Sequence, residues 1–223
     1  MPDTLLVSAK EGFLTAVQAL LDKGANVNGK DNQRRTALML ASQNGHYDVV
    51  VALLDRNADV NEKDNDRMTA LTYASLTGYA GIVKVLLRKK VVHSKDALST
   101  AFIAAASNGY AAIMELLLSR GAEIEFSGEL GDTALLIAAR KGHSQVVKLL
   151  WRKGADVNAH NIYGQRALMA AAEKGDQLSL QFLLGKNAEV NSRDQHGKNA
   201  LNYAIENGHE HLVQLLRQAG SKP

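Results

Sequence analysis

The chain of 223 residues contains no cysteine. It therefore forms no disulfide and offers neither a thiolate nucleophile nor a thiolate metal ligand. Its two prolines, Pro2 and Pro223, leave no proline-rich linker inside the chain. No apolar run approaches the roughly 18 residues of a membrane-spanning helix. The first residues, MPDTLLVSAKEG, do not follow the pattern of a secretory signal. These absences predict a cytoplasmic protein that does not enter membranes, while delivery into another cell as an effector stays open.

Charge of one sign is also scarce. Lys and Arg number 26 and Asp and Glu number 23, which gives a net charge of +3. The longest basic run is Arg88-Lys89-Lys90. Nucleic-acid binding needs a concentrated basic stripe, so this composition disfavours it. A hydrophobic content of 46% with 22% charged residues is typical of a folded, soluble chain.

Catalytic sequence patterns are missing as well. The chain has no Gly-x-Ser-x-Gly elbow, P-loop, His-Glu-x-x-His motif or dinucleotide fingerprint. His209 and His211 are two residues apart, and on a helix such side chains point in different directions. We therefore expect no catalytic residue, no metal site, no cofactor and no small-molecule substrate.

What the sequence does contain is a repeat. A glycine recurs at intervals of 33, 33, 31, 33, 33 and 33 residues, at Gly12, Gly45, Gly78, Gly109, Gly142, Gly175 and Gly208. Thr-Ala-Leu or a close variant precedes six of these glycines, as in Thr36-Ala37-Leu38 and Thr133-Ala134-Leu135. Such a period is the pattern of a repeat architecture.

Each repeat reads as two helices and a loop. Thr36 suits the N-cap of a first helix, which Gly45 ends. Val49, Val50, Leu53 and Leu54 then give a second helix one apolar face. After the second helix the chain offers a residue suited to the left-handed conformation, at Gly24, Asn57, Gly121, Gly154, Asn187 and Gly220. A polar, hairpin-like finger follows.

One helix pair cannot bury its apolar face alone, whereas stacked pairs bury a continuous core. The sequence resembles the ankyrin repeat family in its period and in its Thr-x-Leu motif. The family's proline after the threonine is alanine here, for example at Ala37 and Ala70, which a first helical turn accepts. We predict an all-α ankyrin-repeat solenoid of about seven helix-turn-helix units with β-hairpin-like finger loops, in a single domain spanning 1–223. The predicted units are 4–30, 31–63, 64–95, 96–127, 128–160, 161–193 and 194–220.

The resemblance implies a non-catalytic protein-interaction module that is a monomer. Its partner protein or peptide would dock on a concave surface formed by the fingers and the inner helices. A regulatory inhibitor that occludes a partner enzyme would use the same surface, and the sequence does not separate the two. The partner-binding candidates are Arg34, Arg35, Arg67, Met68, Leu130, Arg140, Lys141, Ile162, Tyr163 and Lys198.

Two features stand out among these candidates. Leu130, Ile162 and Tyr163 place bulky apolar groups at neighbouring fingertips, either as the centre of an interface or as packing of finger against finger. Arg34 and Arg67 occupy fingertip positions that are glycine in later units. With Arg35 they form a positive edge suited to carboxylates, or to nucleic acid in a weaker alternative. The third reading is an ordinary solvated surface, because Asp31, Asp64 and Asp66 lie nearby.

The period breaks once, in RKKVVHSKDALS at residues 88–99, where it falls to 31. Either the finger there is shortened and bent, or the chain has absorbed a harmless deletion. In a malformed finger, Arg88, Lys89 and Lys95 would attract anions.

Overall fold

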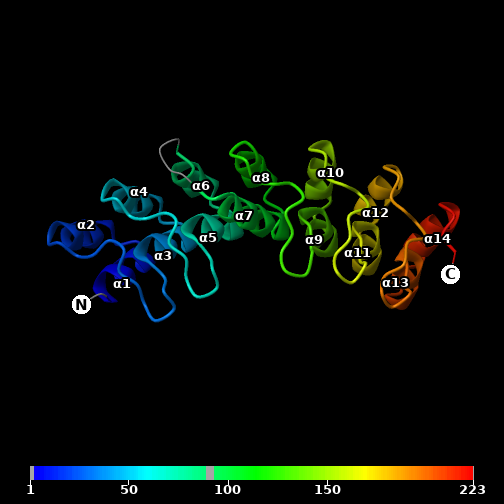
Figure 1. Ribbon diagram of the computed structural model, residues 1–223, viewed down its shortest axis with the longest axis horizontal. Coiled ribbons are helices and arrows are strands. Elements are labelled where there is room, and N and C mark those ends of the chain that lie inside the picture. Colours follow the sequence, from blue (N-terminus) through cyan, green and yellow to red (C-terminus); the bar gives the residue numbers. More distant parts are fainter. Residues whose placement is uncertain (1–2, 89–92, 223) are drawn as a thin grey trace. The chain divides into compact units, whose positions relative to one another are not determined.

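The computed structural model describes residues 3–88 and 93–222, and in this part of the chain it contains fourteen helices (Figure 1). They are α1 (Asp3–Glu11), α2 (Leu14–Asp22), α3 (Ala37–Gln43), α4 (Tyr47–Asp55), α5 (Ala70–Thr77), α6 (Ala80–Leu86), α7 (Lys95–Ser107), α8 (Ala111–Leu118), α9 (Ala134–Lys141), α10 (Ser144–Arg152), α11 (Ala167–Lys174), α12 (Gln177–Leu184), α13 (Ala200–Glu206) and α14 (Glu210–Gln218). The predicted all-α repeat fold is confirmed.

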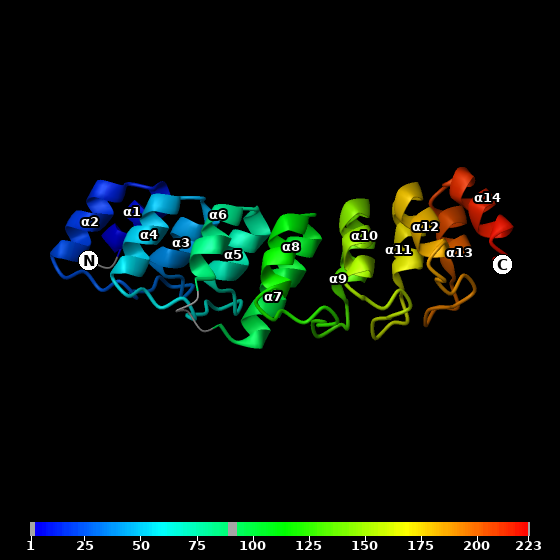
Figure 2. The same cartoon turned by 90° about the horizontal axis from the view of Figure 1, so that it is seen from above.

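The chain divides into two compact units. Unit 1 comprises Met1–Ala105 with Ala112–Ala122, and unit 2 comprises Ala106–Ala111 with Glu123–Pro223. The prediction of a single domain over the whole chain stays a prediction. In unit 1, α3 contacts both α1 and α5, while α4 contacts α2 and α6. In unit 2, α11 contacts α9 and α13, and α12 contacts α10 and α14 (Figure 2). Each unit therefore has an inner row of odd-numbered helices and an outer row of even-numbered ones.

The fingers are loops that lead into the inner helices. Among the described residues, isolated antiparallel bridges close three of them, Lys30 with Thr36, Ser127 with Thr133 and His160 with Arg166. These three fingers are thus hairpin-like as predicted, with a single bridge in each in place of extended strands.

Threonine caps begin several inner helices. The Thr36 hydroxyl accepts a hydrogen bond from the Met39 amide at 3.3 Å, and Thr133 does the same for Leu136. Such a cap satisfies one of the amides that the first helical turn leaves without a partner. Thr100, which the repeat aligns with these caps, instead lies inside α7 and donates to the Asp96 carbonyl. There the Ser94 hydroxyl accepts from the Ala97 amide at 3.1 Å.

This early start of α7 falls within residues 88–99, where the repeat period drops to 31. Residues 95–99 are helical, so the segment before α7 is not a copy of the other fingers. The Arg120 guanidinium donates to the Leu87 carbonyl at the end of α6. Lys89 lies outside the described residues, and the predicted anion-attracting patch with Arg88 and Lys95 therefore stays a prediction.

Left-handed residues end the outer helices as predicted. Their φ angles are between 61° and 95° at all six positions, Gly24, Asn57, Gly121, Gly154, Asn187 and Gly220. The glycines that end the inner helices are also left-handed, and most of them face a side chain of the next repeat. A Cβ at Gly12 would lie 2.5 Å from the His46 ring, and one at Gly45 would lie 2.5 Å from the Tyr79 ring. These glycines leave room for the ring.

The same contact explains the histidines after the repeat glycines. Nε2 of His46 donates to the Lys10 carbonyl at 2.8 Å, and Nε2 of His143 donates to the Ser107 carbonyl at 3.0 Å. Nε2 of His209 donates to the Glu173 carbonyl at 3.1 Å. Each ring thus satisfies a carbonyl near the end of the preceding inner helix, and its role is structural.

Candidate functional site

An aspartate or asparagine shapes most fingertips. Oδ1 of Asp64 accepts from the amides of Asp66 and Met68 at 3.0 and 2.8 Å. Oδ1 of Asn161 accepts from the amides of Tyr163 and Gln165 at 3.0 and 2.9 Å. The same pair of bonds forms at Asp31 and Asp194. One side chain therefore fixes the turn that presents each tip.

Backbone hydrogen bonds join neighbouring tips. In unit 1 the Asn65 amide donates to the Gln33 carbonyl at 3.0 Å. In unit 2 the Ile162 amide donates to the Leu130 carbonyl at 3.1 Å, and the Gln195 amide donates to the Tyr163 carbonyl at 2.9 Å. The tips within each unit are consequently held in fixed register.

The apolar tip cluster of unit 2 consists of Leu130, Ile162 and Tyr163. Their side chains remain 50%, 62% and 37% exposed. The backbones of Leu130 and Ile162 are bonded to each other, yet much of each side chain still faces solvent.

A polar network lies behind this cluster. The Arg140 guanidinium donates to Oδ2 of Asp132 at 2.6 Å and to Oε1 of Gln165 at 3.2 Å. Nδ2 of Asn161 donates to Oδ1 of Asp132 at 2.8 Å and to Oε1 of Gln165 at 3.1 Å. Burial alone would raise the pKa of Asp132, but the bonds from Arg140 and Asn161 outweigh it and hold this pKa below its usual value. The network fixes side chains from consecutive repeats in one arrangement.

A tyrosine hydroxyl bonded to a buried aspartate carboxylate occurs in both units. The Tyr203 hydroxyl donates to Oδ2 of Asp194 at 2.6 Å, and the Tyr73 hydroxyl donates to Oδ2 of Asp64 at 2.6 Å. Burial and the bond to Asp64 raise the pKa of Tyr73 to about 12. Burial also acts to raise the pKa of Asp194, yet the bond from Tyr203 and the fingertip amides keep it below its usual value. The sequence interpretation missed both pairs, although each has the same nine-residue spacing.

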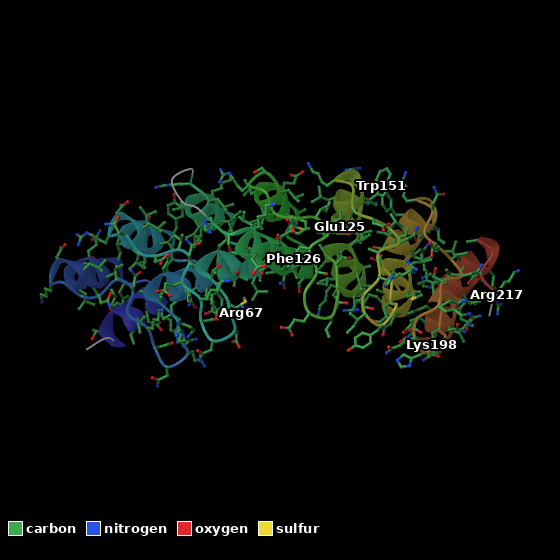
Figure 3. The ribbon with its side chains drawn as sticks, viewed as in Figure 1. Arg67, Glu125, Phe126, Trp151, Lys198 and Arg217 are labelled. Carbon is green, nitrogen blue, oxygen red and sulfur yellow. The ribbon has the colours of Figure 1, made fainter. Side chains whose placement is uncertain are left out.

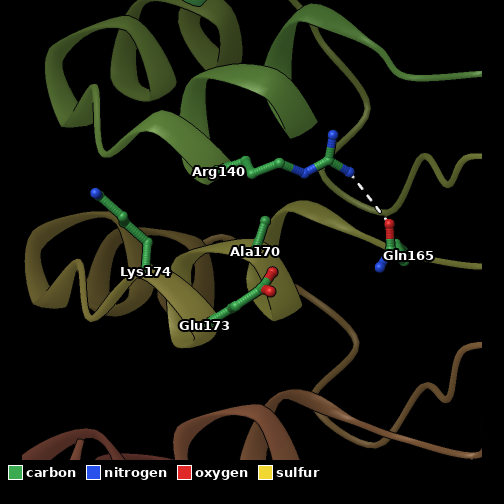
Figure 4. A pocket seen from close by; sticks show the side chains of 5 residues that line it. All are labelled: Arg140, Gln165, Ala170, Glu173 and Lys174. Atoms are coloured by element: carbon green, nitrogen blue, oxygen red, sulfur yellow. Dashed lines mark hydrogen bonds between the residues drawn. The ribbon is translucent and has the colours of Figure 1, made fainter. Parts of the chain in front are cut away.

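A hollow of about 340 Å³ lies beside α9 and α11 (Figure 4). It is lined by Arg140, Gln165, Ala170, Glu173 and Lys174. At the positions 33 residues before and after Ala170 the chain has Ile137 and Tyr203. The hollow thus lies where neighbouring repeats carry a large side chain and this repeat carries a methyl group.

The arginines of unit 1 differ from one another. Arg35 is bound to Asp31, with Nε and Nη2 both 2.8 Å from Oδ2. Arg34 and Arg67 are exposed, and each adopts a left-handed φ of 61°. Neither has an ion pair within the described residues. Figure 3 shows Arg67 at its fingertip.

The remaining candidates are also placed. Met68 is half-buried and donates its amide to Asp64, while Lys141 is exposed at the end of α9. Lys198 forms an ion pair with Glu206 at 2.7 Å. Arg35, Arg140 and Lys198 are therefore already engaged by carboxylates of this chain.

Two other kinds of site are absent from residues 3–88 and 93–222. No group of three or more His, Asp or Glu side chains there is placed to hold a metal ion. Within the same residues, no helix combines the length and apolar character needed to cross a membrane.

Stacked helix pairs, ring-to-glycine contacts and ordered fingers define a helical repeat protein. The family model for ankyrin repeats (3 copies) matches residues 3–64, 61–127, 102–194 and 154–223, and the chain belongs to the ankyrin repeat family. A crystal structure of the human ASB11 ankyrin repeat domain is similar, with a TM-score of 0.87 and 28% identity over 98% of both chains. No match was found among curated proteins. Ankyrin repeats are generally protein–protein interaction modules.

Proposed function

We propose that this protein is a non-catalytic interaction module, and that an extended segment of a partner protein binds to the fingers and inner helices of unit 2. The observation that carries the proposal is the exposure of Leu130, Ile162 and Tyr163 on consecutive fingertips. Apolar and aromatic side chains held in fixed register favour the centre of an interface.

The surroundings of the tip cluster support this proposal. The hollow at Ala170 has room for a partner side chain, and Glu173 and Lys174 at its rim provide polar contacts. The network of Asp132, Arg140 and Asn161 fixes the fingers before binding. A site that is already ordered loses less conformational entropy when the partner arrives.

Adaptor and inhibitor functions would use this same surface. An adaptor holds its partner, whereas an inhibitor also covers the partner's active site. The geometry that favours binding is common to both.

The double substitution Ile162→Ala and Tyr163→Ala tests the proposal. Because both side chains are partly exposed, the free energy of unfolding should change by about 1 kcal/mol, roughly 0.5 kcal/mol for each substitution. Partner affinity should fall by roughly 30-fold, the cost of losing about 2 kcal/mol at an interface centre. Affinity capture read by mass spectrometry identifies the partner, titration of that partner gives the affinity, and urea denaturation gives the stability.

Leu178→Ala is the matched control for this experiment. Leu178 is 58% exposed on the outer helix α12 of the same unit, so its substitution removes similar apolar surface away from the fingers. The control should keep the partners of the wild-type protein. Equal capture by the fingertip variant and the wild type would contradict the proposal.

A further inference from the structure

We propose that Arg34 and Arg67, the fingertip arginines of unit 1, bind a carboxylate-rich segment of a partner protein. This inference rests on the proposed function, since it gives an interaction module a second recognition element with its own chemistry. The unit 2 tips take apolar groups, and the unit 1 tips take acidic ones.

The backbone conformation is the first observation. Arg34 and Arg67 both have φ of 61°, and the corresponding tip residues of unit 2 are Gly131, Gly164 and Gly197 with φ of 73–75°. A side chain in the left-handed region brings Cβ close to the backbone, which glycine avoids. The other non-glycine residues with positive φ in the described chain are Asn57 and Asn187, a residue type that tolerates this region.

Arginine at these two positions therefore gives the turn no structural advantage over glycine. Glycine would form the same turn at lower cost, as it does in unit 2. Unfavourable backbone conformations that the surrounding structure maintains cluster at functional positions. What the two positions gain over glycine is a guanidinium group at each tip.

The availability of these groups is the second observation. Both arginines are exposed, and neither has an ion pair within the described residues. Nearby carboxylates are already engaged, because Asp31 binds Arg35 and Asp64 binds the Tyr73 hydroxyl. Only the exposed Asp66 lies beside Arg67 without such a role in shaping the turn.

The placement of the arginines on two neighbouring fingers indicates the form of the ligand. They lie on adjacent fingers that the Asn65–Gln33 hydrogen bond holds together. A guanidinium presents a planar fork that matches a carboxylate with two parallel hydrogen bonds. Two such forks on neighbouring fingers suit an extended acidic peptide that crosses both tips.

The same tips are poorly suited to nucleic acid. Single strands bind where aromatic rings stack on bases beside a basic groove. The residues around the arginines are Asn32, Gln33, Asn65 and Asp66. They supply no ring on which a base could stack. An acidic peptide can place its carboxylates on the arginines alone.

The test is a titration of the ¹⁵N-labelled full chain with a peptide of ten glutamates, followed by NMR. Amide resonances of residues 32–35 and 65–68 should shift in the wild-type protein. The double variant Arg34→Gly and Arg67→Gly should bind at least tenfold more weakly. Its urea unfolding midpoint should not fall, because glycine fits the left-handed turn. Weaker binding with undiminished stability distinguishes a binding role from a structural one.

Two matched variants sharpen the result. Arg34→Lys with Arg67→Lys keeps the charge and removes the fork, so its affinity should lie between those of the wild type and the glycine variant. Asp66→Asn removes the exposed carboxylate next to Arg67, and it should strengthen binding at least twofold.

Three outcomes would overturn the inference: no shift of the fingertip amides, equal affinity in the glycine variant, or tighter binding of a twenty-nucleotide thymidine strand than of the peptide. The function proposed for unit 2 is tested separately. The Ile162→Ala and Tyr163→Ala variant should bind the glutamate peptide as the wild type does, so either idea can fail while the other stands.

Discussion

The fingertips of unit 1 and unit 2 share one backbone design and carry opposite chemistry. In both units an Asp or Asn side chain fixes the turn, and a tyrosine hydroxyl binds a buried aspartate. Unit 1 places arginine at the left-handed tip residue, at Arg34 and Arg67, whereas unit 2 places glycine there. In unit 2 the exposed apolar side chains at the fingertips are those beside these glycines, Leu130, Ile162 and Tyr163.

This difference shows that the turn and the chemistry at its tip are set separately. The turn requires a positive φ, and glycine meets that requirement without adding a side chain. A finger can therefore expose the side chains next to a glycine tip, as unit 2 does with Ile162 and Tyr163. Alternatively, it can expose the side chain of the tip residue itself, at a cost in backbone strain.

The largest loss of stability is expected at the repeat glycines, where the same substitution should have the same effect in both units. Gly45→Ala in unit 1 and Gly175→Ala in unit 2 would each place a Cβ within 2.5–2.7 Å of the ring of Tyr79 or His209. Each should lower the free energy of unfolding by roughly 2–3 kcal/mol, from the left-handed φ and the displaced ring. Urea denaturation of both variants measures the loss.

Gly208→Ala is the control for these substitutions. Gly208 has φ of 70°, but nothing lies within 4 Å of the position that a Cβ would occupy there. Its cost should be about 1 kcal/mol, from backbone strain alone. If all three variants lose the same stability, the ring contacts contribute nothing.

The tyrosine–aspartate pairs give the next largest effect. Tyr203→Phe and Tyr73→Phe should each cost about 2 kcal/mol at pH 7, because each leaves a buried carboxylate short of a hydrogen bond. The pKa of Asp194 is depressed in the folded state, so its contribution is present above the unfolded pKa and is lost as pH falls through the folded value. The deficit of Tyr203→Phe should consequently shrink toward pH 3, as measured by urea unfolding at both pH values. A deficit that stays constant with pH would rule out the charged partner.

Exchanging the tip residues gives the smallest effect. Gly197→Arg would copy the unit 1 tip into unit 2, where a Cβ meets nothing within 4 Å, and it should cost about 1 kcal/mol of strain. Gly131→Arg should cost more in the same unfolding assay, because its Cβ would lie 3.2 Å from Cα of Asn161. Equal losses would mean that backbone strain alone separates glycine from arginine tips.

Much of the fold could be predicted from the sequence because its determinants are local. The cap at Thr36 acts within three residues, and the left-handed positions at Gly24 and Asn57 depend on intrinsic conformational preference. The position of Thr100 could not be inferred in this way. Helix α7 already begins at Lys95, with Ser94 as its N-cap. This local start places Thr100 inside the helix, although the repeat alignment predicts it as the cap.

The candidate site was less predictable because its contacts join different repeats. Arg140 looked available for a partner, but it binds Asp132 and reaches Gln165 in the next repeat. No local pattern indicates such a contact. The tyrosine pairs left a detectable signal, since Asp64 with Tyr73 and Asp194 with Tyr203 share one spacing.

The rings that cover the repeat glycines also restrict how this chain can change in length. A glycine and the ring that covers it, such as Gly12 with His46, belong to consecutive repeats and lie 34 residues apart. Gaining or losing a whole repeat would keep every ring opposite a glycine. An insertion within a helix would misalign them, so shorter changes are tolerated only in loops.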